Sequence, residues 1–426
     1  MFEQFAEIPA GADEAALVAR IGELETLKSV AAAGQARCAA ALDAARRAAE
    51  AAAGIPAARR ARGLAGEIAL ARRDSPNRGA RHLGLATALV HEMPHTLAAL
   101  QRGALSEWRA TLIVRESACL SVEHRRELDE ELCADPATLT GRGDARLTAT
   151  AKAIAYRLDP QAVVDRAARA QTERSVSIRP APDTMTYVTA LLPVAQGVGV
   201  YAALKRAADT CGDGRSRGQI MADTLVERIT GRPADVAAPI AVNLVLTDET
   251  LLGGAPDAAL ITGYGPIPAT VARALVRCAV TDKRSHATLR RLYRHPGSGA
   301  LLTMQSRSRR FPTALAAFIT LRDGTCRTPY CDAPIRHLDH ARPHARGGGT
   351  TALNGDGMCE ACNYAKEAAG WAVETHTDEN GTHTALFTTP TGQRHRSTAP
   401  PIPVGPPPEI TEMEMRIGIS LAAHAA

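Results

Sequence analysis

The sequence predicts a mainly α protein with a small α+β portion: a long helical N-terminal region, then a compact C-terminal module stapled by zinc. Three observations predict this class. Alanine-rich segments with helical spacing fill the first 174 residues, strand-like segments begin only after them, and four of the nine cysteines fall within 37 residues near the C-terminal end. With 426 residues the chain is too long for one compact core, so we expect two or three domains.

The N-terminal region carries the clearest helix signals. From Asp13 to about Arg73 apolar residues recur at helical spacing, with a break near Gly54 to Pro56. Ser106 and Ser121 precede further helical patterns and are predicted N-caps, as is Asp159 before Pro160. The long helices of residues 13–73 could serve either core packing or dimerisation, and the composition favours packing.

After residue 174 the predicted structure becomes mixed. We expect a hairpin from Ser175–Ile178 and Met185–Leu191, helices over 194–210, 216–231, 270–276 and 312–322, a buried strand over 238–246, a turn at 263–268 and a proline-rich mobile tail over 399–408. The predicted domains are a helical domain at 1–212, a mixed portion with a basic connector at 213–321, a module at 322–375 and an extension at 376–426.

Composition limits where the chain can act. No apolar run approaches the roughly 18 to 20 residues that span a bilayer. The start of the chain carries no basic segment before an apolar stretch, as a secretory signal would. We therefore expect no membrane partner and a cytoplasmic location.

Positive charge is concentrated in one segment. The formal net charge is +5, but residues 283–346 hold 13 basic and 3 acidic residues, a local +10, which leaves 37 basic and 42 acidic residues elsewhere, a net of −5. Arginine abundance partly follows from an alanine- and glycine-rich, GC-biased composition, so the total charge alone does not indicate a nucleic-acid partner. The distribution places a candidate polyanion surface next to the cysteine cluster.

The cysteine cluster predicts a metal site. Cys326 and Cys331 form one pair, and Cys359 and Cys362 form a second pair 27 residues later. Four thiolates match a closed tetrahedral zinc site, which is structural and supplies folding free energy to a segment too short to bury its own core. The alternative is a chance pairing of these cysteines.

A second set of ligand-type side chains lies between the cysteine pairs and directly after the second pair. It comprises His337, Asp339, His340 and Asn363. A carboxylate and a carboxamide are hard ligands, so this set favours magnesium or manganese. Because His337 and Asp339 share a strand face, either could be the ligand, with Asp339 ranked first. The alternative for Asp339 and His340 is a solvated strand end.

The segment with Gly347-Gly-Gly-Thr350, Asn354-Gly and Cys359-Glu-Ala-Cys362-Asn363 resembles the HNH endonuclease motif of the ββα-metal type. The resemblance implies that His340 is the general base, that Asp339 and Asn363 hold the catalytic divalent ion, and that Asn354 ties down the loop and orients the base. Asn363 stands where many relatives have histidine, which implies a changed metal preference.

The resemblance also implies DNA as the partner. Five basic residues are candidate phosphate contacts: Arg327, Arg336, Arg342, Arg346 and Lys366. Over most of residues 10–375 the chain is similar to actinobacterial HNH-signature proteins with an N-terminal domain of unknown function. The sequence thus predicts a metal-dependent DNA endonuclease, and it leaves open whether the chain is a monomer or a homodimer. The alternative is a non-catalytic, zinc-dependent DNA-binding or regulatory protein, which does not require Asp339, His340 and Asn363.

Overall fold

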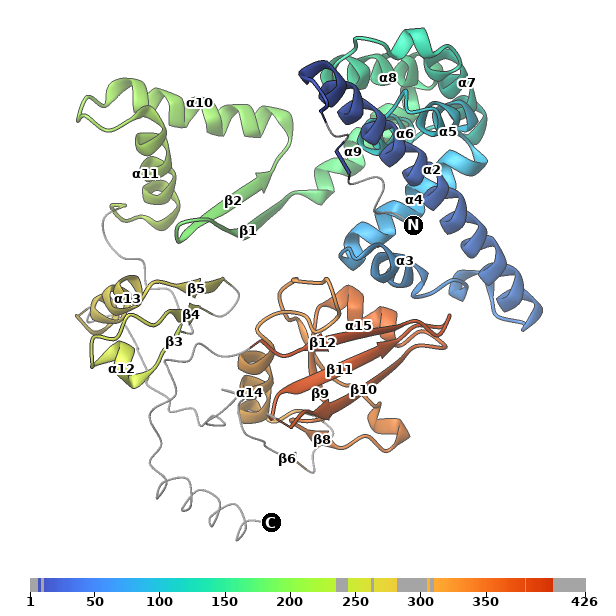
Figure 1. Cartoon of the computed structure of the whole chain (residues 1–426). Helices are drawn as coiled ribbons and strands as arrows, with labels where there is room; N and C mark the ends of the chain where they lie inside the picture. The colour runs from blue at the N-terminus through green and yellow to red at the C-terminus, as the bar shows by residue number, and fades with distance from the viewer. Residues whose placement is uncertain are drawn as a thin grey trace.

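The structure is a computed structural model that describes residues 7–8, 11–234, 244–261, 264–281, 305–306, 310–379 and 381–400 (Figure 1). Most of the predicted strand at 238–246, of the proline-rich tail and of the basic stretch at 283–309 lies outside the described residues.

The first part of the chain is a helical bundle, as predicted. Its helices are α2 (Glu14–Ala52), α3 (Leu64–Arg72), α4 (Pro76–His91), α5 (Pro94–Gln101), α6 (Glu107–Ser117), α7 (Val122–Cys133), α8 (Asp144–Leu158) and α9 (Pro160–Ala170), with 3-10 turns at Ala57–Arg59, Pro136–Leu139 and Gln171–Glu173. The predicted caps form: Ser106 accepts from the Arg109 amide at 3.3 Å, and Ser121 accepts from the His124 amide at 3.2 Å.

The middle of α2 packs into the bundle through small side chains. Ala32, Ala33, Ala36 and Ala39 are buried against apolar residues of α3, α4 and α5. Alanine at this spacing lets neighbouring helices approach closely while it costs no side-chain entropy. This part of α2 therefore serves core packing, the favoured alternative.

The next part contains the predicted hairpin and two helices. The hairpin strands β1 (Ser175–Ala181) and β2 (Met185–Leu191) pair antiparallel, and α10 (Val194–Thr210) and α11 (Arg217–Thr230) follow. Ser216 and Gln219 close a capping box at the start of α11. Then come β3 (Leu244–Val245), α12 (Asp248–Leu251), β4 (Ala259–Ile261), β5 (Gly265–Ile267) and α13 (Ala269–Thr281), with the sheet order β3-β4-β5.

The C-terminal unit combines short strands with two helices. Its elements are β6 (Gln305–Ser306), α14 (Thr313–Asp323), β7 (His337–His340), a 3-10 turn (His344–Arg346), β8 (Thr350–Thr351), β9 (Gly355–Met358) and α15 (Glu360–Lys366). A three-stranded antiparallel sheet follows, with β10 (Ala372–Thr377), β11 (His383–Thr388) and β12 (Arg394–Thr398). No strand was predicted over these residues. Val373, Ala385 and Phe387 of the sheet pack with the four cysteines.

The C-terminal unit contacts α3 of the bundle. Glu67 of α3 is buried and accepts hydrogen bonds from the amide and hydroxyl of Thr391, in the turn between β11 and β12. It also pairs with Arg46 of α2 at 2.9 Å. The buried Trp371 ring lies against Gly63 and Gly66, where a Cβ on Gly63 would approach the ring nitrogen to 2.6 Å.

Among the helices that the structure describes, none has both the length and the apolar character needed to cross a membrane.

Candidate functional site

The four clustered cysteines converge on one point. The sulfur atoms of Cys326, Cys331, Cys359 and Cys362 lie within 4.8 Å of one another, and all four residues are buried and free of disulfides. Cys359 caps α15 and its sulfur accepts the Cys362 amide at 3.4 Å. The cluster could hold a metal such as zinc, because four converging sulfurs are the donor set of a structural zinc site.

The four thiols are coupled to one another by hydrogen bonds. These bonds hold the pKa of the Cys359 thiol well below its usual range and raise the pKa of the Cys331 and Cys362 thiols. Thiolates are the form that binds a metal, so a bound ion would displace the remaining thiol protons.

The second set of residues lies on β7, which pairs antiparallel with β9. His337 lies opposite Met358, Asp339 opposite Asp356 and His340 opposite Gly355. Consecutive strand residues point to opposite faces, and the contacts of Asp339 and His340 follow this rule.

Asp339 faces α15. Its Oδ2 lies 2.7 Å from the Nζ of Lys366, while its Oδ1 accepts the His340 amide at 2.9 Å. Lys366 is buried and also donates to the His340 carbonyl at 3.1 Å and to Glu367 at 2.9 Å. Lys366 was expected to contact a DNA phosphate. Its buried ammonium instead forms an ion pair with Asp339 at the end of β7.

His340 faces the other way. It is 7% exposed, its Nε2 lies 2.9 Å from the Thr350 Oγ1, and its ring centroid lies 4.6 Å from that of Phe311 and 5.6 Å from that of His344. The imidazole therefore has a fixed orientation at the strand end.

Asn354 ties the intervening loop together. Its Oδ1 accepts the Arg342 amide at 2.9 Å, and its Nδ2 donates to the Arg342 carbonyl at 3.1 Å and to the Gly349 carbonyl at 2.8 Å. Gly348 allows this closure, because a Cβ there would lie 1.9 Å from the Arg342 carbonyl oxygen. The position of Asn354 agrees with a loop-fixing role.

Asn363 lies one turn before Lys366 on α15. Its Oδ1 is buried and has no hydrogen-bond partner among the described residues. A buried carbonyl oxygen without a donor is costly unless something binds it, so this atom is available to a cation. His337, half-buried on β7, has its ring 6.1 Å from that of Tyr364, the next residue of α15.

The buried ion pair between Arg322 and Asp323 binds the backbone of β9. Arg322 donates to Asp323 at 2.7 Å and to the Gly355 carbonyl at 2.6 Å, and Asp323 accepts the Gly357 amide at 2.7 Å. Burial, together with the charge of Asp323, raises the pKa of Asp356 to about 7. Sequence reasoning missed this network, because an Arg-Asp pair at a helix end carries no distinguishing local signal.

Arg327 belongs to the same interior network. Its side chain is 3% exposed, its Nε lies 3.6 Å from Asp323 Oδ1, and it donates to the Ser397 carbonyl at 2.9 Å. This corrects the expectation that Arg327 contacts a nucleic-acid phosphate, since its guanidinium is withdrawn from solvent. The other three candidates, Arg336, Arg342 and Arg346, are exposed.

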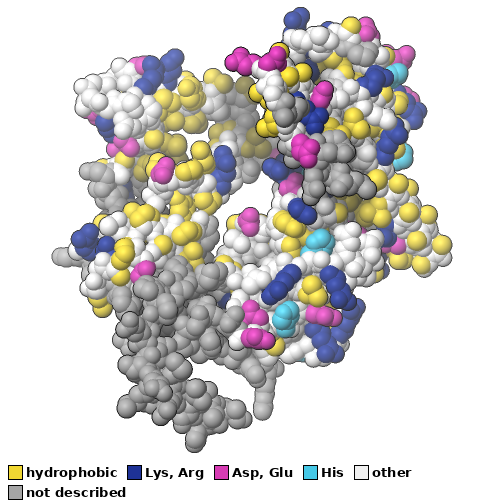
Figure 2. Space-filling model, in the orientation of Figure 1, with side chains coloured by type: hydrophobic (Ala, Val, Ile, Leu, Met, Phe, Trp, Pro, Cys, Tyr) yellow, Lys and Arg dark blue, Asp and Glu magenta, His cyan; other side chains and the backbone are white. Residues whose placement is uncertain are grey.

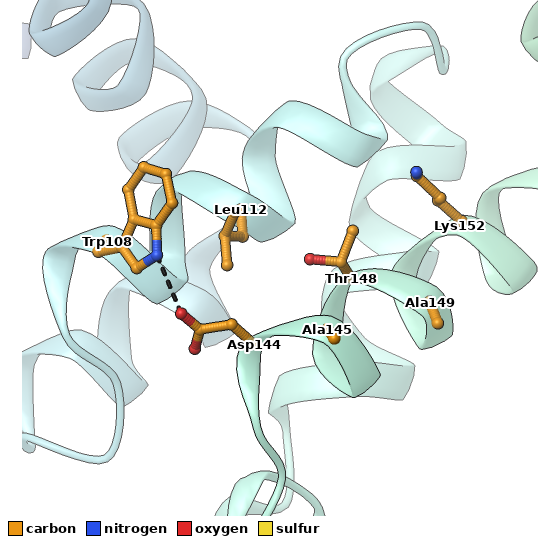
Figure 3. Close-up of a pocket in the computed structure, with 7 residues that line it drawn as sticks. All are labelled: Trp108, Leu112, Asp144, Ala145, Thr148, Ala149 and Lys152. Atoms are coloured by element: carbon orange, nitrogen blue, oxygen red, sulfur yellow. Dashed lines mark hydrogen bonds between the residues drawn. The ribbon is translucent and has the colours of Figure 1, made fainter. Parts of the chain in front are cut away.

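A separate hollow lies in the helical bundle, between α6 and α8 (Figure 3). It measures about 380 Å³ and is lined by Trp108, Asp144 and Lys152 among others. The Trp108 Nε1 donates to Asp144 at 3.0 Å, so the polar groups at its rim are satisfied in part by each other.

Comparison with known proteins assigns the N-terminal three-quarters of the chain. A family model described as a domain of unknown function (DUF222) matches residues 21–323. The chain belongs to this family. The DUF222 match ends at Asp323, just before Cys326, so the cysteine cluster and β7 lie beyond it.

An uncharacterized protein, Rv3776, of Mycobacterium tuberculosis (strain ATCC 25618 / H37Rv) is 39% identical over 95 residues, which are 22% of this chain and 16% of that relative. The chain thus matches less than a fifth of the relative's length. No solved structure matches. The DUF222 description names no activity, so any indication of function comes from the side chains of β7, α15 and the cysteine cluster.

Proposed function

We propose that this DUF222 protein is a metal-dependent endonuclease whose C-terminal unit hydrolyses DNA phosphodiester bonds. One observation carries the proposal: Asp339 and His340 end β7, and α15, which packs against β7, presents a buried and unpartnered Asn363 Oδ1. A strand end in a purely structural module requires neither this acceptor nor an oriented histidine.

In this proposal His340 is the general base. A neutral imidazole takes a proton from the attacking water near pH 7, and it must be held in one orientation to do so. The Thr350 hydroxyl and the Phe311 ring provide that orientation. Asn354 supports the base indirectly, because it fixes the loop between Arg342 and Gly349.

Asp339 and Asn363, with His337 as the further candidate, would hold a magnesium or manganese ion. The ion when bound would polarise the scissile phosphate and stabilise the departing oxygen. Asp339 and Asn363 fit such an ion, because both offer hard oxygens and, within the part of the chain that the structure describes, no donor binds the Asn363 Oδ1. Cys326, Cys331, Cys359 and Cys362 would hold a structural zinc ion.

DNA is the proposed partner because the exposed arginines lie in the same unit. Arg336 precedes β7, and Arg342 and Arg346 lie in the loop that Asn354 fixes. Contacts of this kind bind the phosphate backbone without selecting a sequence.

A second candidate function is a non-catalytic, zinc-dependent DNA-binding or regulatory protein. The Asp339–Lys366 pair favours it, since a carboxylate held by a buried ammonium can serve a purely structural role.

Plasmid cleavage by the zinc-loaded chain separates the two functions. We expect the wild type to convert supercoiled plasmid to nicked circles with magnesium or manganese, and His340→Ala to lose at least about 100-fold in rate while it still binds DNA. His376→Ala, which removes an exposed histidine of β10, is the matched control and should cleave normally. Cleavage unchanged in His340→Ala, or binding without cleavage by the wild type, would support the second function.

A further inference from the structure

Residues 175–230 expose more large hydrophobic side chains per residue than the rest of the described chain. Across the 56 residues from Ser175 to Thr230, Ala208 and Ile220 alone are buried. The same segment carries 12 of the 27 exposed large hydrophobic residues of the described chain. Figure 2 shows hydrophobic side chains gathered on this part of the molecule.

Ten of these exposed residues lie between Ser175 and Leu204, which we call the apolar arm. They are Val176, Ile178, Met185, Tyr187, Val188, Leu191, Val194, Val198, Val200 and Tyr201. A two-stranded hairpin alone is marginally stable in water. Within the described chain the Tyr264 hydroxyl donates to the Ala181 carbonyl at 3.1 Å, while the apolar side chains of the arm stay exposed.

One face of the hairpin carries no charge and is apolar except for Thr186, which lies opposite Pro180 near the turn. The strand register places Val176 opposite Ala190 and Ile178 opposite Val188, and alternation puts these four side chains on one face. Val176, Ile178 and Val188 are 72%, 70% and 57% exposed. We call this set the aliphatic face.

The opposite face is mixed. Ser177 lies opposite Thr189, and Arg179 lies opposite Tyr187 with its guanidinium 4.1 Å from the ring centroid. This face therefore holds a charged group, whereas the aliphatic face carries no charged side chain.

We propose that the aliphatic face is the contact surface between two copies of this chain. A two-fold contact places a patch against the same patch of its partner, so charges within it would repel their own copies. The apolar arm contains two charged residues, Arg179 and Asp183, and neither belongs to the aliphatic face. A neutral aliphatic patch is complementary to itself.

The size of the arm agrees with this partner. A stable interface takes about 800 Å² from each side and involves roughly 20 to 30 residues a side, and its core is depleted in charge. The aliphatic face alone is smaller than this, so the rest of the 30-residue apolar arm around it would complete one such side. The proposal is independent of the nuclease chemistry.

Sedimentation equilibrium of the full zinc-loaded chain tests the contact. Between about 1 and about 100 µM, the wild-type mass should rise from 44.9 kDa toward twice that value. Ile178→Glu with Val188→Glu places two carboxylates on the aliphatic face and should weaken dimerisation by at least about 100-fold. The control, Ser177→Glu with Thr189→Glu, adds the same charges to the same strands on the opposite face and should dimerise like the wild type.

Hydrogen exchange provides a readout that does not depend on the variants. In the wild type, amides of β1 and β2 should exchange more slowly at high than at low protein concentration, while those of α4 to α8 should not change. A wild type that stays monomeric, a dimer that survives Ile178→Glu with Val188→Glu, equal dissociation by the control pair, or an arm whose exchange is independent of concentration each overturns the proposal.

Discussion

Lys366 connects the two halves of the proposed catalytic site. Burial alone lowers the pKa of this lysine, but hydrogen bonds to Asp339 and Glu367 outweigh burial and hold the pKa above its usual value. The ammonium therefore stays charged and keeps α15 joined to the end of β7.

His383 predicts how stability changes with pH. Burial and the nearby Arg322 and Arg327 cations lower the pKa of His383 to about 4, and its Nε2 lies 2.8 Å from the Leu353 carbonyl. The unfolded chain therefore binds a proton below about pH 6.5 that the folded chain binds only near pH 4. Stability contributed by neutral His383 is complete above pH 6.5 and is lost as pH falls through this window.

We expect His383→Gln to remove this dependence. Between pH 7.5 and pH 5.5 the wild type should lose about 1.4 kcal/mol more unfolding free energy than the variant, because about one pH unit of the window is crossed. Urea unfolding at the two pH values measures the difference. Equal losses in both proteins would show that folding does not lower the pKa of His383.

Among the elements, the strands β10–β12 and helix α15 depend on the cysteine cluster. Val373, Ala385 and Phe387 pack with the sulfurs, and Trp371 carries the same unit onto α3. Metal binding in such a small unit supplies much of its folding free energy. Removal of the metal should therefore release this sheet from the bundle.

Cys359→Ser tests this dependence. We expect one zinc ion per wild-type chain and loss of that zinc in the variant, together with a red shift of Trp371 fluorescence as the ring meets water. The background substitution Trp108→Phe in both proteins isolates the Trp371 signal, because Trp108 is the second of the two tryptophans and is 57% exposed. Cys278→Ser, at an exposed cysteine of α13, should retain zinc. A metal-free wild type with Trp371 still buried would contradict the structural role.

The sequence anticipated the elements that local signals define. Ser106 and Ser121 indicated helix starts because their hydroxyls cap the backbone amides that follow. The register of the β1–β2 hairpin follows from its short turn. The close pairs of cysteines predicted their convergence, since the spacing of the ligands is itself local.

Nonlocal packing explains what sequence reasoning could not supply. The sheet β10–β12 contains many threonines and gains its buried face only against the cysteines, so its strands carry a weak pattern. Arg327 resembles any surface arginine until its partners Asp323 and Ser397 are known. The roles of Asp339, His340 and Asn363 remain proposals, although the structure gives each a specific environment.

At the scale of the whole molecule, Glu67 joins the bundle to the C-terminal unit. Its carboxylate receives Arg46 from α2 and Thr391 from beyond β11, and it is 3% exposed. Glu67→Ala removes the partner of the partly buried Arg46 guanidinium and the acceptor for Thr391, and should lower the free energy of unfolding by about 2 kcal/mol. Denaturant unfolding measures the loss.

The matched control is Glu23→Ala, which breaks the exposed pair with Arg20 at 3.0 Å. That change should cost less than about 0.5 kcal/mol. Equal effects of the two substitutions would mean that Glu67 does not couple the two parts of the chain.

The proposed nuclease activity depends on a divalent ion held by Asp339 and Asn363. The most direct measurement is the magnesium dependence of plasmid nicking by the zinc-loaded full chain, compared between wild type and Asn363→Ala. We predict saturable nicking by the wild type, and a variant that needs at least about 10-fold more magnesium or is inactive. Nicking that persists in a magnesium chelator, or the same magnesium dependence in both proteins, would contradict the account.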